Sequence, residues 1–416
     1  SGADALAYCA PAPARPARPR DSATRLTAPA LSILSLLLAA LLVGGCSRKQ
    51  PEPEPTTAPA AATTGAEAPD AAHLPPGIDW FAGDVDAAFA AARAANKPVF
   101  LYWGAEWCPP CAQIKSTIFN RREFQERSRL FVPVYLDGDT PSAQKQGERF
   151  GVVGYPTMIL FRPDGTEITR LPGSVGVERY GRILDVALAD ARPVKEILAA
   201  ATAGGELSGN DWQLLAYYSW GTDNGRLVPA ADRIATFRTL SQRCPAEMSA
   251  DCARLYFQYL MAASQAADDG KSPLSGLERA SDRKRLLELL GSPAVGRANV
   301  DYLLYGQKDA IALLSDAGSP ERKALVQAWS AALDRLGSDA GSPLSAPEQL
   351  MVLRARVLLA QLDAPDAPLP PALLDQIRTT VARVDAGTTD PYARQAMVNA
   401  AAGIYWEAGM NDDANR

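Results

Sequence analysis

Hydrophobic positions divide the 416-residue chain into four stretches of different character. Residues 1–46 end in an uncharged apolar run, and residues 47–76 contain almost no large apolar side chain. Short apolar runs alternate with amphipathic stretches over residues 77–192, whereas helical periodicity alone continues over residues 193–416. Because a chain of this length exceeds one typical hydrophobic core, the pattern predicts two folded domains behind an N-terminal tail and a linker.

The alternating stretch predicts an α/β domain. Apolar residues recur at helical spacing in its amphipathic parts, and its continuous apolar runs have the length of buried strands. In chain order the expected elements are a helix over 84–95, a strand over 99–103, a helix starting at the cysteine pair 108/111, a strand over 130–136, a helix over 141–150, a hairpin of 157–161 with 167–171, and a helix over 177–188. This order is typical of a central mixed sheet flanked by helices.

The second folded stretch predicts an all-helical domain of stacked hairpins. Leu325, Trp329 and Leu333 lie on one apolar stripe that stops at Gly337, and Asp390 is followed by proline, as at a helix start. One segment near the C-terminus matches the tetratricopeptide consensus in spacing, but no period of about 34 residues recurs elsewhere. The repeat-like character therefore rests on that single segment.

Composition and charge narrow the possible functions. Hydrophobic residues make up 47% of the chain, charged residues make up 21%, and the net charge is −5, so the chain offers no basic surface for nucleic acid. The single histidine, His73, falls in the linker, which excludes Ser-His-Asp and Cys-His catalysis and histidine-based metal cages. Six cysteines remain to carry chemistry, and Cys9, in an Ala/Pro/Arg-rich run, receives no function.

Cys108 and Cys111 are the best candidates for chemistry, because they follow a predicted strand and begin a predicted helix. Two cysteines three residues apart on a first helical turn face the same side, at a separation that a disulfide tolerates. Unpaired N–H groups at the helix start stabilise a thiolate, so we expect Cys108 to be exposed with a lowered pKa, and Cys111 to be unshifted. Cys108 would attack a disulfide and Cys111 would resolve the mixed disulfide. Half of a zinc site and an inert structural disulfide are the alternatives.

The residues around this pair resemble the thioredoxin family of thiol–disulfide oxidoreductases. Residues 105–111 (AEWCPPC) are similar to its active-site run, residues 155–157 (YPT) to its cis-proline loop, and Gly173 to the glycine after its last strand. Residues 97–99 (KPV) and 117–119 (TIF) are similar in detail to the C-terminal domain of the disulfide reductase DsbD.

The resemblance implies a thioredoxin fold for residues 77–192 that works without a cofactor or metal. It implies that Trp107, Tyr155, Pro156 and Thr157 contact the substrate, with Pro156 in the cis form. The family usually carries a buried aspartate six residues before its first cysteine, where this chain has Tyr102. Glu106 is then the candidate proton acceptor, and we expect electron flow in the reducing direction.

The N-terminal apolar run predicts a secretory signal and a lipid anchor. Residues 31–43 follow several arginines and lead into Gly44, Gly45 and Cys46, which resembles a bacterial lipobox whose cysteine receives the lipid. An ordinary signal peptide or a short membrane anchor is the alternative. Ser47 in place of aspartate favours the outer membrane, and residues 47–76 would be a disordered linker on the periplasmic side.

Cys244 and Cys252 bracket a short segment between two helical stretches, and in an oxidising compartment we expect a structural disulfide, with a second redox pair as the alternative. The sequence as a whole predicts a membrane-tethered oxidoreductase. Its expected partners are envelope proteins with cysteines or disulfides and an upstream electron-donor thiol protein. The competing hypothesis is a helical scaffold that binds partners and uses the thioredoxin-like domain to capture them with little turnover.

Overall fold

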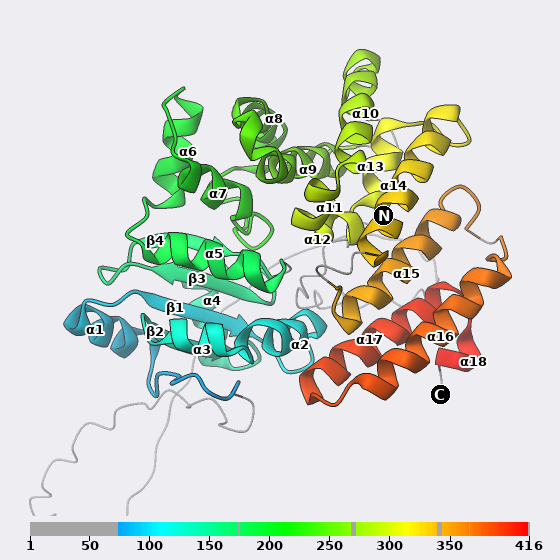
Figure 1. Ribbon diagram of the computed structural model, residues 1–416. Coiled ribbons are helices and arrows are strands. Elements are labelled where there is room, and N and C mark those ends of the chain that lie inside the picture. The colour runs from blue at the N-terminus through cyan, green and yellow to red at the C-terminus, as the bar shows by residue number, and fades with distance from the viewer. Residues whose placement is uncertain (1–73, 174, 268–271, 339–342, 366, 415–416) are drawn as a thin grey trace, which may run out of the picture. The chain divides into compact units, whose positions relative to one another are not determined.

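The computed structural model describes residues 74–414, apart from 174, 268–271, 339–342 and 366. A four-stranded mixed sheet lies in its N-terminal part (Figure 1), with strand order β2-β1-β3-β4. The strands are β1 (Val99–Gly104), β2 (Val132–Asp137), β3 (Thr157–Phe161) and β4 (Glu167–Leu171). Strand β1 pairs parallel with β2 and antiparallel with β3, and β3 pairs antiparallel with β4. The predicted thioredoxin-like fold is confirmed.

Helices cover both faces of the sheet because successive strand residues point to opposite sides. Leu101 and Trp103 of β1 pack in one apolar cluster with α1 and α4, whereas Phe100 and Tyr102 pack in another with the helices of the opposite face. The covering helices are α1 (Val85–Ala95), α2 (Pro109–Ile114), η2 (Lys115–Phe119), α3 (Arg122–Ser128), α4 (Pro141–Phe150) and α5 (Val177–Leu188). Strand β1 is buried along its whole length, which explains its uninterrupted apolar sequence.

Local sequence signals set the ends of these helices. Asp84 caps α1 by accepting a hydrogen bond from the Ala87 amide at 2.7 Å, and Thr140 caps α4 in the same way. Helix α4 ends at Gly151, whose φ of 61° is left-handed and suits glycine. α2 and η2 form one continuous helix, 109–119, which we call the cysteine helix, and η2 is a π-helical turn at its end. The sequence analysis did not predict α3, which follows it.

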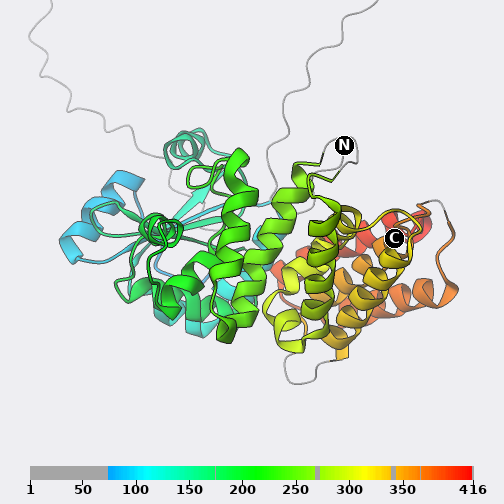
Figure 2. The same cartoon turned by 90° about the horizontal axis from the view of Figure 1, so that it is seen from above.

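After residue 193, the regular elements among the described residues are all helices, joined by loops, as predicted. Figure 2 shows the later helices, yellow to red, gathered beside the part that contains the sheet. In chain order the elements are α6 (Val194–Thr202), α7 (Gly209–Tyr217), η3 (Ala230–Asp232), α8 (Arg233–Arg243), η4 (Ala246–Met248), α9 (Ser249–Gln265), α10 (Gly276–Gly291), α11 (Pro293–Ala298), α12 (Val300–Tyr305), α13 (Gln307–Leu314), α14 (Pro320–Ser338), α15 (Ala346–Ala360), α16 (Pro371–Gly387), α17 (Pro391–Glu407) and α18 (Asn411–Ala414).

The helical part completes the sheet rather than standing apart from it. β4 is an edge strand, so one side of its backbone has no neighbouring strand. Ser219 pairs with one group on this strand by donating its amide hydrogen to the Arg170 carbonyl at 3.0 Å. The Arg170 side chain is fully buried, where it donates to the carbonyls of Phe150 and Thr222 and pairs with Glu167. One hydrophobic cluster continues across residue 192 into the helices. The expected boundary there separates two kinds of secondary structure but not two cores.

The predicted signal run, Cys46 and the linker up to residue 73 lie outside the described residues. Among the helices that the structure describes, none combines the length and apolar character needed to cross a bilayer.

Candidate functional site

Cys108 and Cys111 lie where the sequence places them, at the junction of a strand and a helix. Cys108 is the N-cap of α2, Pro109 takes the first helical position, and the amide of Cys111 donates to Cys108 Sγ at 3.3 Å. Both residues carry thiols, and both have a relative exposure of 0%. The expectation that Cys108 is exposed is therefore wrong for this structure.

Cys108 is buried in an apolar cluster, and the helix that it caps is covered by a later part of the chain. On the inner side it packs in the cluster that contains Ala105 and Tyr155. On the outer side α17, far away in the sequence, lies against α2 (Figure 1). Gln395 Nε2 of α17 donates to the Glu106 carbonyl oxygen at 3.2 Å, beside the cysteine pair. The C-terminal helices therefore cover a face of the cysteine helix.

A second hydrogen bond holds the start of α17 at the far end of the same helix. Asn120, the residue after η2, donates its side-chain amide to Asp390 Oδ2 at 3.1 Å. Asp390 also caps α17 by accepting the amide hydrogen of Ala393 at 2.8 Å. The two contacts of α17 thus span the cysteine helix from its first turn to its last.

Trp107, which precedes Cys108 in the sequence, contacts the loop that contains Pro156. The Tyr155–Pro156 peptide bond is cis. Trp107 is 49% exposed, donates its indole N–H to Asp139 Oδ2 at 2.8 Å, and meets the Tyr155 ring edge to face at 6.1 Å. Trp107 is accordingly a surface available to a partner, and Asp139 is an orienting residue that the sequence analysis missed.

Tyr155 and Thr157 are placed differently from the substrate-contacting residues that were expected. Both side chains are buried, and their hydroxyls donate to the Gly138 and Gly154 carbonyls at 2.9 Å and 2.7 Å. A Cβ atom on Gly138 would lie 2.3 Å from the Tyr155 ring, so only glycine admits this approach. These side chains hold the loop around Pro156 in place.

The ionisable groups next to Cys111 also differ from expectation. Glu106, the expected proton acceptor, has an exposed side chain. Lys115 is only 3% exposed and donates from Nζ to the Tyr135 hydroxyl at 3.1 Å. Tyr102 is fully buried, and burial next to the negative charge of Cys111 raises the pKa of its hydroxyl well above the ordinary value. Lys115, Tyr102 and Tyr135 are therefore the buried polar groups next to Cys111.

The pKa of Cys111 is lowered, although we expected only that of Cys108 to shift. Burial alone would raise the pKa, but the hydrogen bonds with Cys108 and the Ala105 backbone, together with the charge of Lys115, outweigh burial. The pKa of Cys111 therefore depends on polar and charged groups packed around its sulfur. The sequence signal for Lys115 was its place one helical turn after Cys111.

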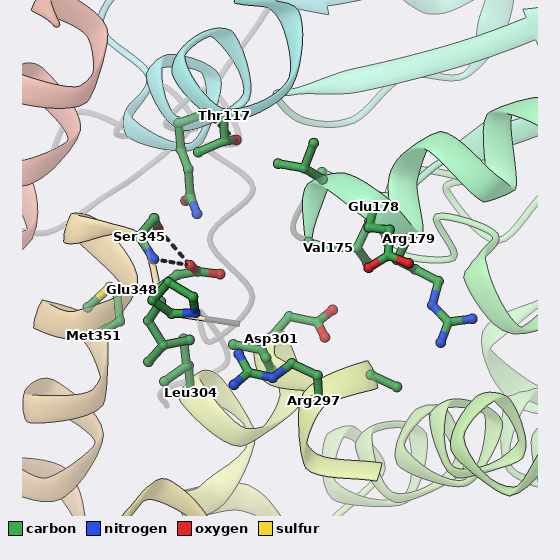
Figure 3. Close-up of a pocket in the computed structure, with 18 of the residues that line it drawn as sticks. Thr117, Val175, Glu178, Arg179, Arg297, Asp301, Leu304, Ser345, Glu348 and Met351 are labelled. Carbon is green, nitrogen blue, oxygen red and sulfur yellow. Dashed lines mark hydrogen bonds between the residues drawn. The ribbon is translucent and has the colours of Figure 1, made fainter. Parts of the chain in front are cut away.

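A cavity of about 630 Å³ lies between the cysteine helix and the helical part (Figure 3). Gln113 and Thr117 line it from the cysteine helix, and Gly173 lines it from the loop after β4. Gly173 follows β4 by two residues, so the cavity borders the cysteine helix on one side and the end of β4 on another.

The opposite walls of this cavity are polar and charged. Figure 3 shows Glu178 and Arg179 on α5 on one side, Arg297 and Asp301 on α11 and α12 below, and Glu348 on α15 across from α5. Arg179 pairs with Asp251 on α9 at 3.1 Å, which ties α5 to the helical part. Asp301 is held in a buried pair with Arg254 at 2.6 Å. The volume of the cavity falls within the range of ligand sites, about 300–1,000 Å³.

The other cysteine pair is joined in a disulfide. Cys244 and Cys252 are bonded, with their Cα atoms 5.6 Å apart, and connect the end of α8 to the first turn of α9. Their sulfurs are therefore unavailable as metal ligands.

Comparisons with known proteins match the part of the chain that carries the sheet. A family model described as a thioredoxin-like domain matches residues 85–188. Thioredoxin from Mycobacterium tuberculosis is 35% identical over 92 residues, which are 22% of this chain and 75% of that protein. Thiol:disulfide interchange protein DsbD 1 from Pseudomonas aeruginosa is 33% identical over 85 residues, which are 20% of this chain and 14% of that protein. The solution structure of a thioredoxin from Thermus thermophilus is 26% identical with a TM-score of 0.25, and the match covers 27% of this chain and 88% of that chain.

Proposed function

Since the chain belongs to the thioredoxin-like family, we propose that it is a membrane-tethered thiol–disulfide oxidoreductase outside the cytoplasm. The observation that carries the proposal is the placement of Cys108 at a helix N-cap, where its sulfur accepts the Cys111 amide hydrogen at 3.3 Å. A thiolate at that position is stabilised by the backbone, which makes it a nucleophile at neutral pH.

The reaction runs in two exchanges. The Cys108 thiolate attacks one sulfur of a partner disulfide, the partner's sulfur–sulfur bond breaks, and its second sulfur leaves as a thiolate that takes up a proton. The Cys111 thiolate then attacks Cys108 Sγ, forms the Cys108–Cys111 disulfide and releases the first partner sulfur. Two electrons pass to the partner in this reducing direction, and an upstream thiol protein must return them.

The partners we propose are envelope proteins with cysteines or disulfides, recognised partly by the cavity beside the redox site. Because the cavity is bordered by the cysteine helix and by the loop of Gly173, a segment flanking a disulfide held at Cys108 can enter it. A large side chain at Val175, as in Val175→Trp, should then slow turnover of a protein disulfide while leaving turnover of a small aromatic disulfide unchanged. Equal effects on the two substrates would argue against the cavity.

The proposed location is the bacterial periplasm, with lipid on Cys46 as the tether and the outer membrane as its site. It rests on the apolar run at 31–43, the small residues before Cys46 and Ser47 after it. Lipid chains contribute about 0.8 kcal/mol per buried CH₂, so a lipoprotein with several chains remains anchored.

A second candidate function is a helical scaffold that captures partners with little turnover. The burial of Cys108 and the packing of α17 on α2 favour it, because a covered thiol reacts slowly. Turnover of a small disulfide with a thiol reductant separates the two. The oxidoreductase predicts catalysis that disappears in Cys108→Ser, whereas the scaffold predicts the same low rate in both proteins.

A further inference from the structure

Lys115 is a buried charge that the proposed reaction has not yet used. It lies one helical turn after Cys111 on the same face of the cysteine helix, and it is 3% exposed. Lysine is almost never fully buried unless its charge is paired. The helix at this point is a π-helical turn, a feature that is frequent at functional sites.

Groups from three sides face Lys115. On its own helix these groups are Cys111 and the N-cap Cys108. Glu106 lies in the loop before the helix, and the negative charges of all three groups raise the pKa of Lys115. From β2, Tyr135 accepts the hydrogen bond from Nζ and presents its ring 5.3 Å away, and Asp137 acts from the end of the strand.

From β1, the buried Tyr102 ring packs against the Tyr135 ring, with centroids 5.2 Å apart. The pKa of its hydroxyl is raised by burial and by the negative charge of Cys111. Burial lowers the pKa of Lys115 more than the surrounding negative groups raise it. Lys115 therefore loses its proton at a lower pH than a lysine on the surface does.

We propose, on the premise of the oxidoreductase function, that Lys115 accepts the proton of the Cys111 thiol when the mixed disulfide is resolved. Before this step Cys108 Sγ is bonded to the partner's sulfur. The Cys111 S–H proton passes to the Lys115 amine, the Cys111 thiolate attacks Cys108 Sγ, and the partner leaves as a thiolate. The ammonium of Lys115 then returns its proton to the leaving thiolate or to water, so that atoms and charges balance.

Tyr102 stands where the related proteins usually carry a buried aspartate, and in this proposal Lys115 takes over the role of that aspartate as proton acceptor. An aspartate becomes neutral when it takes up the proton, whereas Lys115 becomes positively charged. Its ammonium then lies near the newly formed thiolate, which the low polarity of a buried site makes a favourable pair.

The experiment uses the full chain and DTNB, a chromogenic aromatic disulfide. Attack by Cys108 releases one TNB anion and leaves a mixed disulfide, and attack by Cys111 releases the second. Stopped-flow absorbance therefore reports the two steps as two phases. The variants are Lys115→Met, Lys115→Arg and, as a matched control on the surface, Lys145→Met.

In Lys115→Met the second phase should slow about tenfold or more, and its pH midpoint should rise because the Cys111 thiolate can no longer form together with a neighbouring ammonium. The first phase should change little. Arginine keeps the charge but does not release its proton, so Lys115→Arg should retain the midpoint and still slow the second phase. A second phase restored to the wild-type rate by arginine, or unaffected by methionine, would overturn the proposal.

Two further measurements keep the outcomes separate. If Lys115→Met does not fold, Tyr135→Phe removes the hydrogen bond to Nζ and leaves the lysine in place, and an unchanged pH midpoint of the second phase then counts against the proposal. With Cys9 and Cys46 replaced by serine in every protein, a parent that releases no TNB, or a Cys108→Ser variant that still releases two equivalents, refutes the oxidoreductase function itself. Two wild-type phases without sensitivity to Lys115 refute only the role of the lysine.

Discussion

Loosening helix α17 should make Cys108 reactive. Two side-chain hydrogen bonds, Asn120 to Asp390 and Gln395 to the Glu106 carbonyl, tie this helix to the two ends of the cysteine helix. The perturbation is the double variant Asn120→Ala with Gln395→Ala. It leaves Asp390 intact, so α17 keeps its N-cap.

The size of the effect follows from the two contacts. Both lie at the protein surface, where a hydrogen bond contributes about 0.5–1.5 kcal/mol to stability. Losing both should weaken the docking of α17 by about 1–3 kcal/mol, which changes the ratio of undocked to docked protein by a factor of about 5–150. If Cys108 reacts only when α17 is undocked, its alkylation should accelerate by the same factor.

The assay is the rate of alkylation by iodoacetamide in a Cys111→Ser background, so that one thiol of the pair is observed. Arg394→Ala serves as a control on the same helix, because its guanidinium pairs with Asp385 at 3.3 Å and not with the cysteine helix. Thermal unfolding of each variant shows whether a faster rate reflects local or global opening.

One result would refute this reasoning. If the double variant, the Arg394 control and the parent react at the same rate, then α17 is not the barrier, and the burial of Cys108 comes from its packing with Ala105 and Tyr155 alone. Truncation before Pro391 would give the same answer only if the shortened chain still unfolds cooperatively.

The other predictions concern the cysteines. Cys111→Ser should trap mixed disulfides with partners, seen as high-mass bands on non-reducing gels that collapse with reductant, and Cys108→Ser should show none; bands in a Cys108/Cys111 double variant would move the site elsewhere. Cys46→Ser should release the protein from the membrane fraction, and mass spectrometry of an unmodified mature N-terminus in the parent would exclude the lipid. Replacing Cys244 and Cys252 by serine should lower the free energy of unfolding by about 2–3 kcal/mol, as expected for a short closed loop, and leave the rate of disulfide reduction intact; equal thermal midpoints with and without the bond would contradict the structural role.

Local chemistry alone was enough to predict the sheet and the cysteine helix. The strands and the hairpin are continuous apolar runs bounded by turn residues, and the helices are marked by caps such as Asp84 and Thr140. The place of Cys108 at a helix start follows from the strand before it and the proline after it. Each of these features depends on residues close in sequence, so their periodicity and capping determine them.

The state of the candidate site was decided by contacts between distant parts of the chain. The sequence marks Cys108 and Cys111 as the candidate pair, but it cannot show that α17 lies over their helix, because Gln395 and Glu106 are 289 positions apart. It shows Lys115 one turn after Cys111, but not that β2 and the loop before the helix bury it. Burial, and with it the pKa of Cys111, depends on which surfaces pack together. The sequence by itself therefore determined which residues are the candidates for chemistry. Only the tertiary structure decided how accessible they are and how the pKa of Cys111 shifts, because solvent exclusion and charge pairing arise from packing between segments that are far apart in the chain.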